Sequence, residues 1–172
     1  MAVGARASKG VKLVGTDSVD PKSRTLRAGP LSVEFGNGAL RYIRVNDVEV
    51  LRAIAFLVRD KNWGTYNPEI SGLKVSQSKG GFAIRYHARC GDSSAAIAYD
   101  ATIRCGADGS LGFEATATPE TDFATNRTGF VVLHPLKGVA GFPVEVEHTN
   151  GKKEKSKFPA PVNPLMPTVV PG

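Results

Sequence analysis

Hydrophobic and polar residues alternate along most of this chain, with the period of two that is typical of half-buried β-strands. The alternation is clearest over residues 82–86, 95–105 and 111–117. Short segments rich in glycine, aspartate and serine separate these runs, and separators at such regular intervals predict hairpin turns. Residues 48–60 fit a helical stripe about as well, but their β-branched and aromatic content favours a strand. The pattern predicts an all-β fold, an antiparallel β-sandwich, over residues 24–158.

Two further turns and the two ends of the chain complete this outline. Gly36-Asn37-Gly38 and Asn46-Asp47 tolerate positive φ angles, so each predicts a tight turn between two strands. Residues 1–23 are rich in glycine, serine, lysine and aspartate without periodicity, which predicts a flexible, disordered leader. Residues 159–172 contain five prolines and no strand pattern, which predicts a proline-rich linker or tail.

One segment, residues 126–135, contains an unbroken run of glycine and large apolar residues between polar ends. Such a run predicts a strand buried on both faces. It would bring Arg127 and His134 to the rims of the sheet, where binding groups are common. Arg127 then either holds a carboxylate or sugar hydroxyl or forms an ion pair with Asp122. His134 is either a ligand contact or a histidine at the edge of the core that bonds to backbone.

Trp63 is the only tryptophan, and it lies in a predicted loop that also contains aspartate and asparagine. Sugar faces stack on aromatic rings, while amides and carboxylates bond to sugar hydroxyls, so the loop suits carbohydrate binding. The alternative is that Trp63 fills space beneath the loop. The sequence has no recognisable catalytic motif, and its three histidines lack the spacing of metal ligands. We therefore predict no catalytic residue, no metal and no other cofactor in this chain.

The distribution of charge bears on possible partners, and the cysteines bear on the cellular compartment. The net charge is +6, but residues 1–30 carry +4, residues 137–172 carry +2 and the middle is neutral. Nucleic-acid modules gather basic residues on one folded face, so we expect no nucleic-acid binding. The start of the chain has no secretory signal pattern, and no apolar run is long enough to span a membrane. Cys90 and Cys105 are predicted to lie too far apart for a disulfide, which suits a reducing cytoplasm.

Four segments resemble the N-terminal region of the D-apionate lactonase family. They are LRYIR at 40–44, VEVLR at 48–52, VRDKNWGT at 58–65 and NRTGFVVLHP at 126–135. The resemblance extends over about residues 26–167. It implies a bacterial sugar-acid enzyme that hydrolyses D-apionolactone to D-apionate. It also implies that a barrel similar to those of glycoside hydrolases follows the β-rich region, and that the acidic residues of this barrel act in catalysis.

The resemblance predicts that this chain is the N-terminal β-sandwich domain, or a fragment, of a sugar-lactone hydrolase without catalysis of its own. It would pack on a catalytic barrel and border a sugar or sugar-acid pocket through Trp63, Arg127 and His134. Two alternatives remain open. One is a sugar enzyme like aldose epimerase, half of a galactose-mutarotase-like fold, with His134 as acid or base. The other is a carbohydrate-binding module that uses Trp63 and Tyr66.

Overall fold

The structure, a computed structural model, describes residues 22–160. These residues form eleven strands and no helix, so the predicted all-β class is confirmed for them. The strands are β1 (Arg24–Ala28), β2 (Leu31–Gly36), β3 (Ala39–Val45), β4 (Val48–Asp60), β5 (Glu69–Ser78), β6 (Gly81–Gly91), β7 (Ala96–Gly106), β8 (Leu111–Pro119), β9 (Thr125–Leu133), β10 (Pro143–Glu147) and β11 (Lys153–Lys157). The predicted leader and tail lie almost wholly outside the described residues, and the domain boundaries at 24 and 158 stay a prediction.

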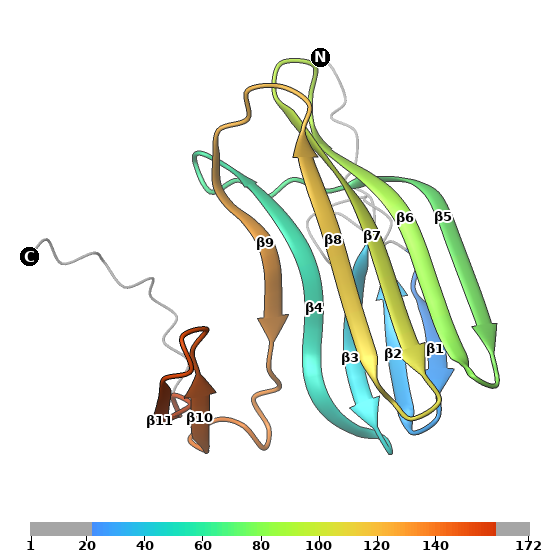
Figure 1. Cartoon of the computed structure of the whole chain (residues 1–172), viewed down its shortest axis with the longest axis vertical. Coiled ribbons are helices and arrows are strands. Elements are labelled where there is room, and N and C mark those ends of the chain that lie inside the picture. The colour runs from blue at the N-terminus through green and yellow to red at the C-terminus, as the bar shows by residue number, and fades with distance from the viewer. Residues whose placement is uncertain (1–21, 161–172) are drawn as a thin grey trace, which may run out of the picture.

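The strands form two main antiparallel sheets that stack face to face, as the predicted β-sandwich requires (Figure 1). The first sheet has the order β1-β2-β3-β4-β9, and the second is the meander β5-β6-β7-β8. The chain leaves the first sheet after β4 and returns to its edge with β9. The hairpin of β10 and β11 forms a separate two-stranded sheet beside the sandwich (Figure 1). The first sheet therefore has β9 as one of its two edge strands.

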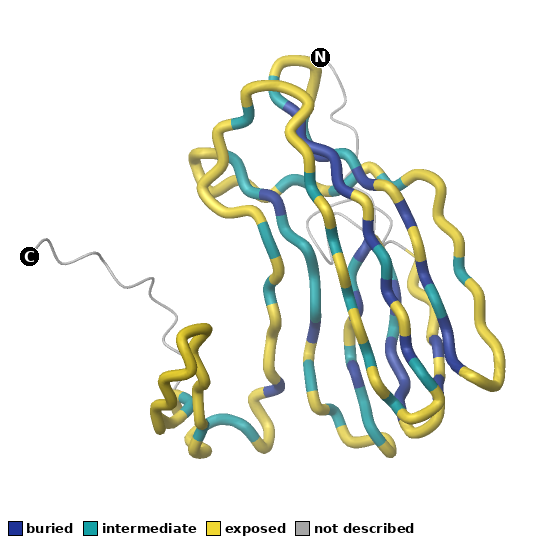
Figure 2. The backbone as a smooth tube through the Cα atoms, viewed as in Figure 1, coloured by how far each residue is buried: buried dark blue, intermediate teal, exposed yellow. Residues whose placement is uncertain are grey.

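The hydrophobic core lies between the two sheets and is built from alternate residues of their strands (Figure 2). In β6 and β7 the inward positions are buried, and outward ones such as Arg85, His87 and Asp100 are charged or polar and exposed. The most completely buried large side chains are Tyr99, Leu26, Leu40, Ile43, Ile84, Ile103, Val33 and Val58. Burial of each such side chain stabilises the fold by roughly 1.5–3 kcal/mol, which sets the register of both sheets. One buried hydrogen bond joins the sheets, from the Tyr86 hydroxyl to the Gly38 carbonyl at 2.8 Å.

Local sequence explains the tight turns of the first sheet. Asn37 and Gly38 both have positive φ angles, 47° and 73°, and they connect β2 to β3 as a two-residue hairpin loop. Asn46 and Asp47 do the same between β3 and β4, with φ angles of 49° and 64°. Positive φ at both central residues is the type I′ turn that matches the twist of antiparallel strands. Both predicted turns are confirmed, and so is the strand prediction for residues 48–60.

The prediction that residues 126–135 form a strand buried on both faces is wrong. β9 pairs only with β4, and Phe130, Val132 and Leu133 are 45%, 47% and 49% exposed. The second sheet ends at β8, so no described strand lies over much of β9 (Figure 2). The apolar residues of β9 form a surface that is suited to burial. Their composition alone does not say which part of a protein would cover that surface.

The two cysteines are free, as predicted, and both are buried. Cys90 pairs with Ile97 in the β6–β7 register, whereas Cys105 pairs with Phe82 at the other end of the same hairpin. Burial raises the pKa of both thiols, so both stay protonated at neutral pH. In the part of the chain that the structure describes, no helix is long and apolar enough to cross a membrane.

Candidate site at the β4–β9 end of the first sheet

Trp63 and Arg127, two of the predicted binding residues, lie together at one end of the first sheet. The Arg127 guanidinium stacks on the Trp63 ring at 5.2 Å from its centroid. Arg59 stacks on the same ring at 5.8 Å. Arg59 and Arg127 are direct cross-strand partners at the end of β4 and the start of β9. We call these three residues the arginine–tryptophan cluster.

The loop after β4 holds Trp63 in a defined position. Asp60 Oδ1 accepts hydrogen bonds from the backbone N–H groups of Asn62 at 2.7 Å and Gly64 at 2.9 Å. The Asp60 N–H donates to the Gly64 carbonyl at 2.9 Å, which closes the loop. Trp63 has a φ of 71°, an unusual angle for a bulky residue, and this network stabilises it there. A Cβ on Gly64 would lie 2.5 Å from the Asp60 carboxylate, so a larger residue at this position would displace that carboxylate.

The start of β9 is fixed to the end of β4 as well. The Thr125 hydroxyl donates to the Arg59 carbonyl at 2.6 Å and lies 2.9 Å from the Thr128 hydroxyl. The β4–β9 register shifts between Arg59 and Asp60, just before the tryptophan loop, with one extra residue on the β9 side. The backbone that carries the two arginines is therefore fixed by the β4–β9 pairing and by the hydrogen bonds of the two threonines.

The cluster has the chemistry of an anion or sugar site. Within residues 22–160 no carboxylate forms an ion pair with Arg59 or Arg127, so the alternative pairing of Arg127 with Asp122 is not formed. Trp63 is 44% exposed, which contradicts the alternative that it fills space beneath the loop. Guanidinium groups bind carboxylates and hydroxyls through several parallel N–H donors, and an exposed indole can stack on a sugar face.

His134 does not join this cluster. It follows the last residue of β9 and is exposed, with its ring 5.2 Å from the ring of Phe158 beyond β11. It stands seven residues along the chain from Arg127, which is about 23 Å in an extended strand. The structure therefore brings together two of the three predicted binding residues and places the third at the opposite end of β9.

A second stacked cluster, not predicted from the sequence, lies on β3 and β4. The guanidinium groups of Arg44 and Arg52 lie 5.4 Å and 5.2 Å from the centroid of the Tyr42 ring. Tyr42 has a φ of 49° within a strand, at an irregular point of the β3–β4 ladder. We call these residues the arginine–tyrosine cluster. Like Arg59, its members could not be grouped without the register of the sheet, because no motif or spacing links them.

A hollow of about 620 Å³ runs along the face of the first sheet that turns away from the second sheet, which we call the outer face, and it also reaches Phe56, Tyr66 and Cys90 of the core. Its lining includes Ala53, Ala55 and Leu57 of β4 and their neighbours Val131 and Leu133 of β9. These positions alternate along the strands with the core residues, so they point out of the sandwich. Arg41 and Tyr42 also line the hollow.

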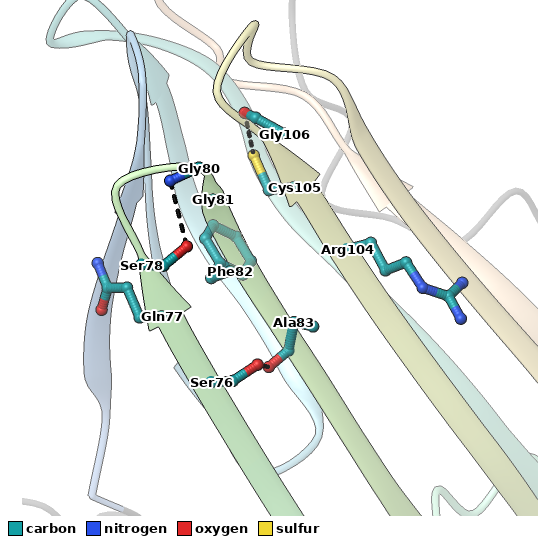
Figure 3. Close-up of a pocket in the computed structure, with 10 residues that line it drawn as sticks. All are labelled: Ser76, Gln77, Ser78, Gly80, Gly81, Phe82, Ala83, Arg104, Cys105 and Gly106. Atoms are coloured by element: carbon teal, nitrogen blue, oxygen red, sulfur yellow. Dashed lines mark hydrogen bonds between the residues drawn. The ribbon is translucent and has the colours of Figure 1, made fainter.

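A smaller depression, of about 470 Å³, lies at the far end of the second sheet, around the turn between β5 and β6 (Figure 3). Its polar groups are used within the chain: the Gly80 N–H donates to Ser78 Oγ at 3.1 Å, and Ser76 Oγ donates to the Ala83 carbonyl at 3.5 Å. The Arg104 side chain extends away from the glycines of the turn (Figure 3). None of the predicted binding residues lines this depression.

The titratable groups with shifted pKa values have structural causes. Burial raises the pKa of Tyr99 to about 12, and burial followed by the neighbouring Tyr99 raises that of Tyr86 still further. Asp92 and Asp108 have lowered pKa values because each carboxylate accepts hydrogen bonds from a serine two residues later, in a turn. These shifts therefore come from the core and from turns, and none belongs to the two stacked clusters.

The comparison with known proteins agrees with the resemblance described above. The family described as "D-apionate lactonase, N-terminal domain" matches residues 11–170, nearly the whole chain. The chain belongs to this family. A D-apionate lactonase of Brucella anthropi is 46% identical over 156 residues, which cover 90% of this chain but only 26% of that relative. The chain thus spans about a quarter of the length of the curated relative it matches, and no solved structure matches it.

Proposed function

We propose that this chain is the N-terminal part of a sugar-lactone hydrolase that converts D-apionolactone to D-apionate, and that it has no hydrolase activity alone. In this proposal the β-sandwich packs on a catalytic domain, which corresponds to the remaining length of the Brucella anthropi relative. The arginine–tryptophan cluster borders the sugar-acid pocket between them. A bacterial, cytoplasmic setting is part of the proposal and agrees with two free, buried thiols.

The arginine–tryptophan cluster is the observation that carries this proposal. Arg59 and Arg127 stack on one exposed indole and have no carboxylate partner within residues 22–160. Two adjacent guanidinium groups repel each other, and an anion between them relieves that repulsion. A sugar acid offers both a carboxylate for the arginines and a ring or chain face for Trp63. The hydroxyls of the uncharged lactone can accept the same hydrogen bonds before hydrolysis.

His134 lies about 23 Å from Arg127, at the other end of β9. It would border the same sugar-acid pocket only if the catalytic domain covered both ends of this strand. The epimerase alternative asks His134 to act as acid or base, and such a group is normally oriented by a partner. In the described part of the chain His134 has a ring contact with Phe158 and no hydrogen-bonded partner. The geometry therefore favours the lactonase proposal over the epimerase alternative.

The proposal is tested with a chimera in which this chain replaces the matching quarter of the Brucella anthropi D-apionate lactonase. D-apionate is titrated into the chimera and into its Arg127→Ala variant by calorimetry. Loss of a charge-assisted contact of about 1.5–3 kcal/mol should raise the Kd for D-apionate about tenfold or more. The matched control is Arg85→Ala, which removes an exposed arginine from the outward side of β6 and should leave the Kd unchanged. Equal affinities in all three proteins would refute the sugar-acid role of the cluster.

A further inference from the structure

We infer that the outer face of the first sheet, across β3, β4 and β9, is the surface on which the catalytic remainder of the lactonase docks. This inference rests on the proposed function, because it takes the remainder of such an enzyme as the occupant. It goes further by assigning the contact to one face of the sandwich and by stating the chemistry of the matching surface.

The outward sides of the two sheets differ in chemistry. On the second sheet this side carries exposed ion pairs, including His87 with Asp100 at 3.0 Å and Arg104 with Glu114 at 3.5 Å. On the first sheet the matching positions of β4 and β9 are small or apolar and line the hollow of about 620 Å³. The second sheet therefore presents a surface typical of contact with water, whereas the first presents one typical of a protein interface.

The two stacked clusters lie on the same face as the hollow. Arg59 continues the outward positions of β4 after Leu57, and Arg127 lies opposite it on β9. Tyr42 lines the hollow itself, with Arg44 and Arg52 against its ring. Arginine, tyrosine and tryptophan are the residues that contribute most at protein interfaces, around an apolar centre. The face has this arrangement. Arg52 is already paired with Glu49, whereas Arg59 and Arg127 have no ion-pair partner within residues 22–160 and would pair with carboxylates on the occupant.

The edge of β9 gives a second, independent indication. β9 ends its sheet, and within residues 22–160 no strand pairs with its other side. Edge strands of free-standing domains usually carry lysine or proline, which discourages pairing with other chains. β9 has neither, and Arg127 is its only charged residue. Its large apolar residues are exposed on both of its sides, as expected for a strand that another part of the protein covers.

The length of the matching relative indicates what would cover the outer face. The match covers 26% of that relative, so about three quarters of the relative lies outside the segment that this chain matches. A second copy of this chain is the competing occupant. It would have to place the same arginine-rich clusters against each other, and neighbouring like charges oppose such a contact. The catalytic remainder has no such restriction, so we assign the face to it.

Thiol labelling tests the assignment with two matched cysteine variants. Ala55→Cys places a probe in the hollow, and Thr102→Cys places one on the outward side of β7; both residues are half-buried in the middle of a strand. In this chain alone both probes should react with a maleimide, whereas the buried native thiols react slowly. In the chimera the Ala55→Cys rate should fall by about tenfold or more, since labelling then requires local opening, while the Thr102→Cys rate stays the same.

The other outcomes each overturn the inference. Equal Ala55→Cys rates in the chain and the chimera would show that the face stays open, and selective protection of Thr102→Cys would place the contact on the second sheet. An unreactive Ala55→Cys in the isolated chain would mean that the chain covers its own face or pairs with a second copy, which sedimentation velocity distinguishes. The D-apionate titration separates the two proposals: unchanged binding in Arg127→Ala with protection at Ala55→Cys would remove the sugar-acid role and leave the docking face.

Discussion

At the residue scale, the position of Trp63 depends on one aspartate and one glycine. Asp60 accepts two backbone hydrogen bonds within the loop, and Gly64 leaves room for its carboxylate. We predict that Gly64→Ala displaces that carboxylate and loosens the loop, at a cost of about 1–2 kcal/mol in unfolding free energy. Because Trp63 is the only tryptophan, its fluorescence anisotropy in the isolated chain reports the loop directly and should fall. Gly112→Ala, where an added Cβ meets nothing, should leave the anisotropy unchanged; equal effects would contradict this reading of the loop.

Residue type alone pointed to Trp63 and Arg127 but could not identify Arg59. A lone tryptophan beside asparagine and aspartate, and an arginine next to an apolar run, are unusual enough to be noticed. Arg59 is one of many arginines, and its importance comes from pairing with Arg127, which lies 68 positions further along the chain. His134 shows the opposite error. It is close to Arg127 in the sequence and follows the same strand, but it lies far from the arginine–tryptophan cluster.

At the scale of elements, the apolar residues of β9 should contribute little to the stability of the isolated chain. Leu133 is 49% exposed, so Leu133→Glu should change the unfolding free energy by no more than about 0.5 kcal/mol. Leu40 is fully buried in β3, and Leu40→Ala should cost about 2–5 kcal/mol. Urea denaturation of the two variants measures both values. A loss at Leu133 as large as that at Leu40 would mean that β9 is covered within this chain.

The strands themselves were predictable, and the depth of their burial was not. In β6, β7 and β8, hydrophobic and polar residues alternate because one side of each strand faces the core of the sandwich. This period of two, together with the turn residues between the strands, is enough to identify them from the sequence. The run in β9 has the composition of a buried strand, which is why sequence reasoning placed it at the centre of the fold. Its place at the edge follows from the strand order of the first sheet, and its exposure follows from the second sheet ending at β8.

At the scale of the whole molecule, the buried tyrosines and cysteines set the response to alkaline pH. Tyr99 has a pKa raised to about 12, and Tyr86, Cys90 and Cys105 have pKa values raised by burial. Each group binds its proton more tightly in the folded state. Stability is therefore fully present below about pH 8, where the unfolded thiols and phenols also stay protonated, and falls as the pH rises towards 12.

Thermal denaturation between about pH 7 and 12 measures this fall. The midpoint should stay level to about pH 8 and then decrease. Tyr99→Phe removes one of the groups that ionise in the unfolded chain, so its midpoint should decrease less steeply over the same interval. Tyr42→Phe is the control, because Tyr42 lies on the outer face and not in the core. A midpoint that stays level to pH 12 would contradict the burial of these groups.

The whole-molecule account requires that this domain contributes to hydrolysis only together with a catalytic domain. The most direct test is acid release from D-apionolactone, followed by pH-stat for the 172-residue chain and for the chimera. The account predicts release by the chimera and no release above the buffer rate by the chain alone. Acid release by the purified chain alone would contradict it.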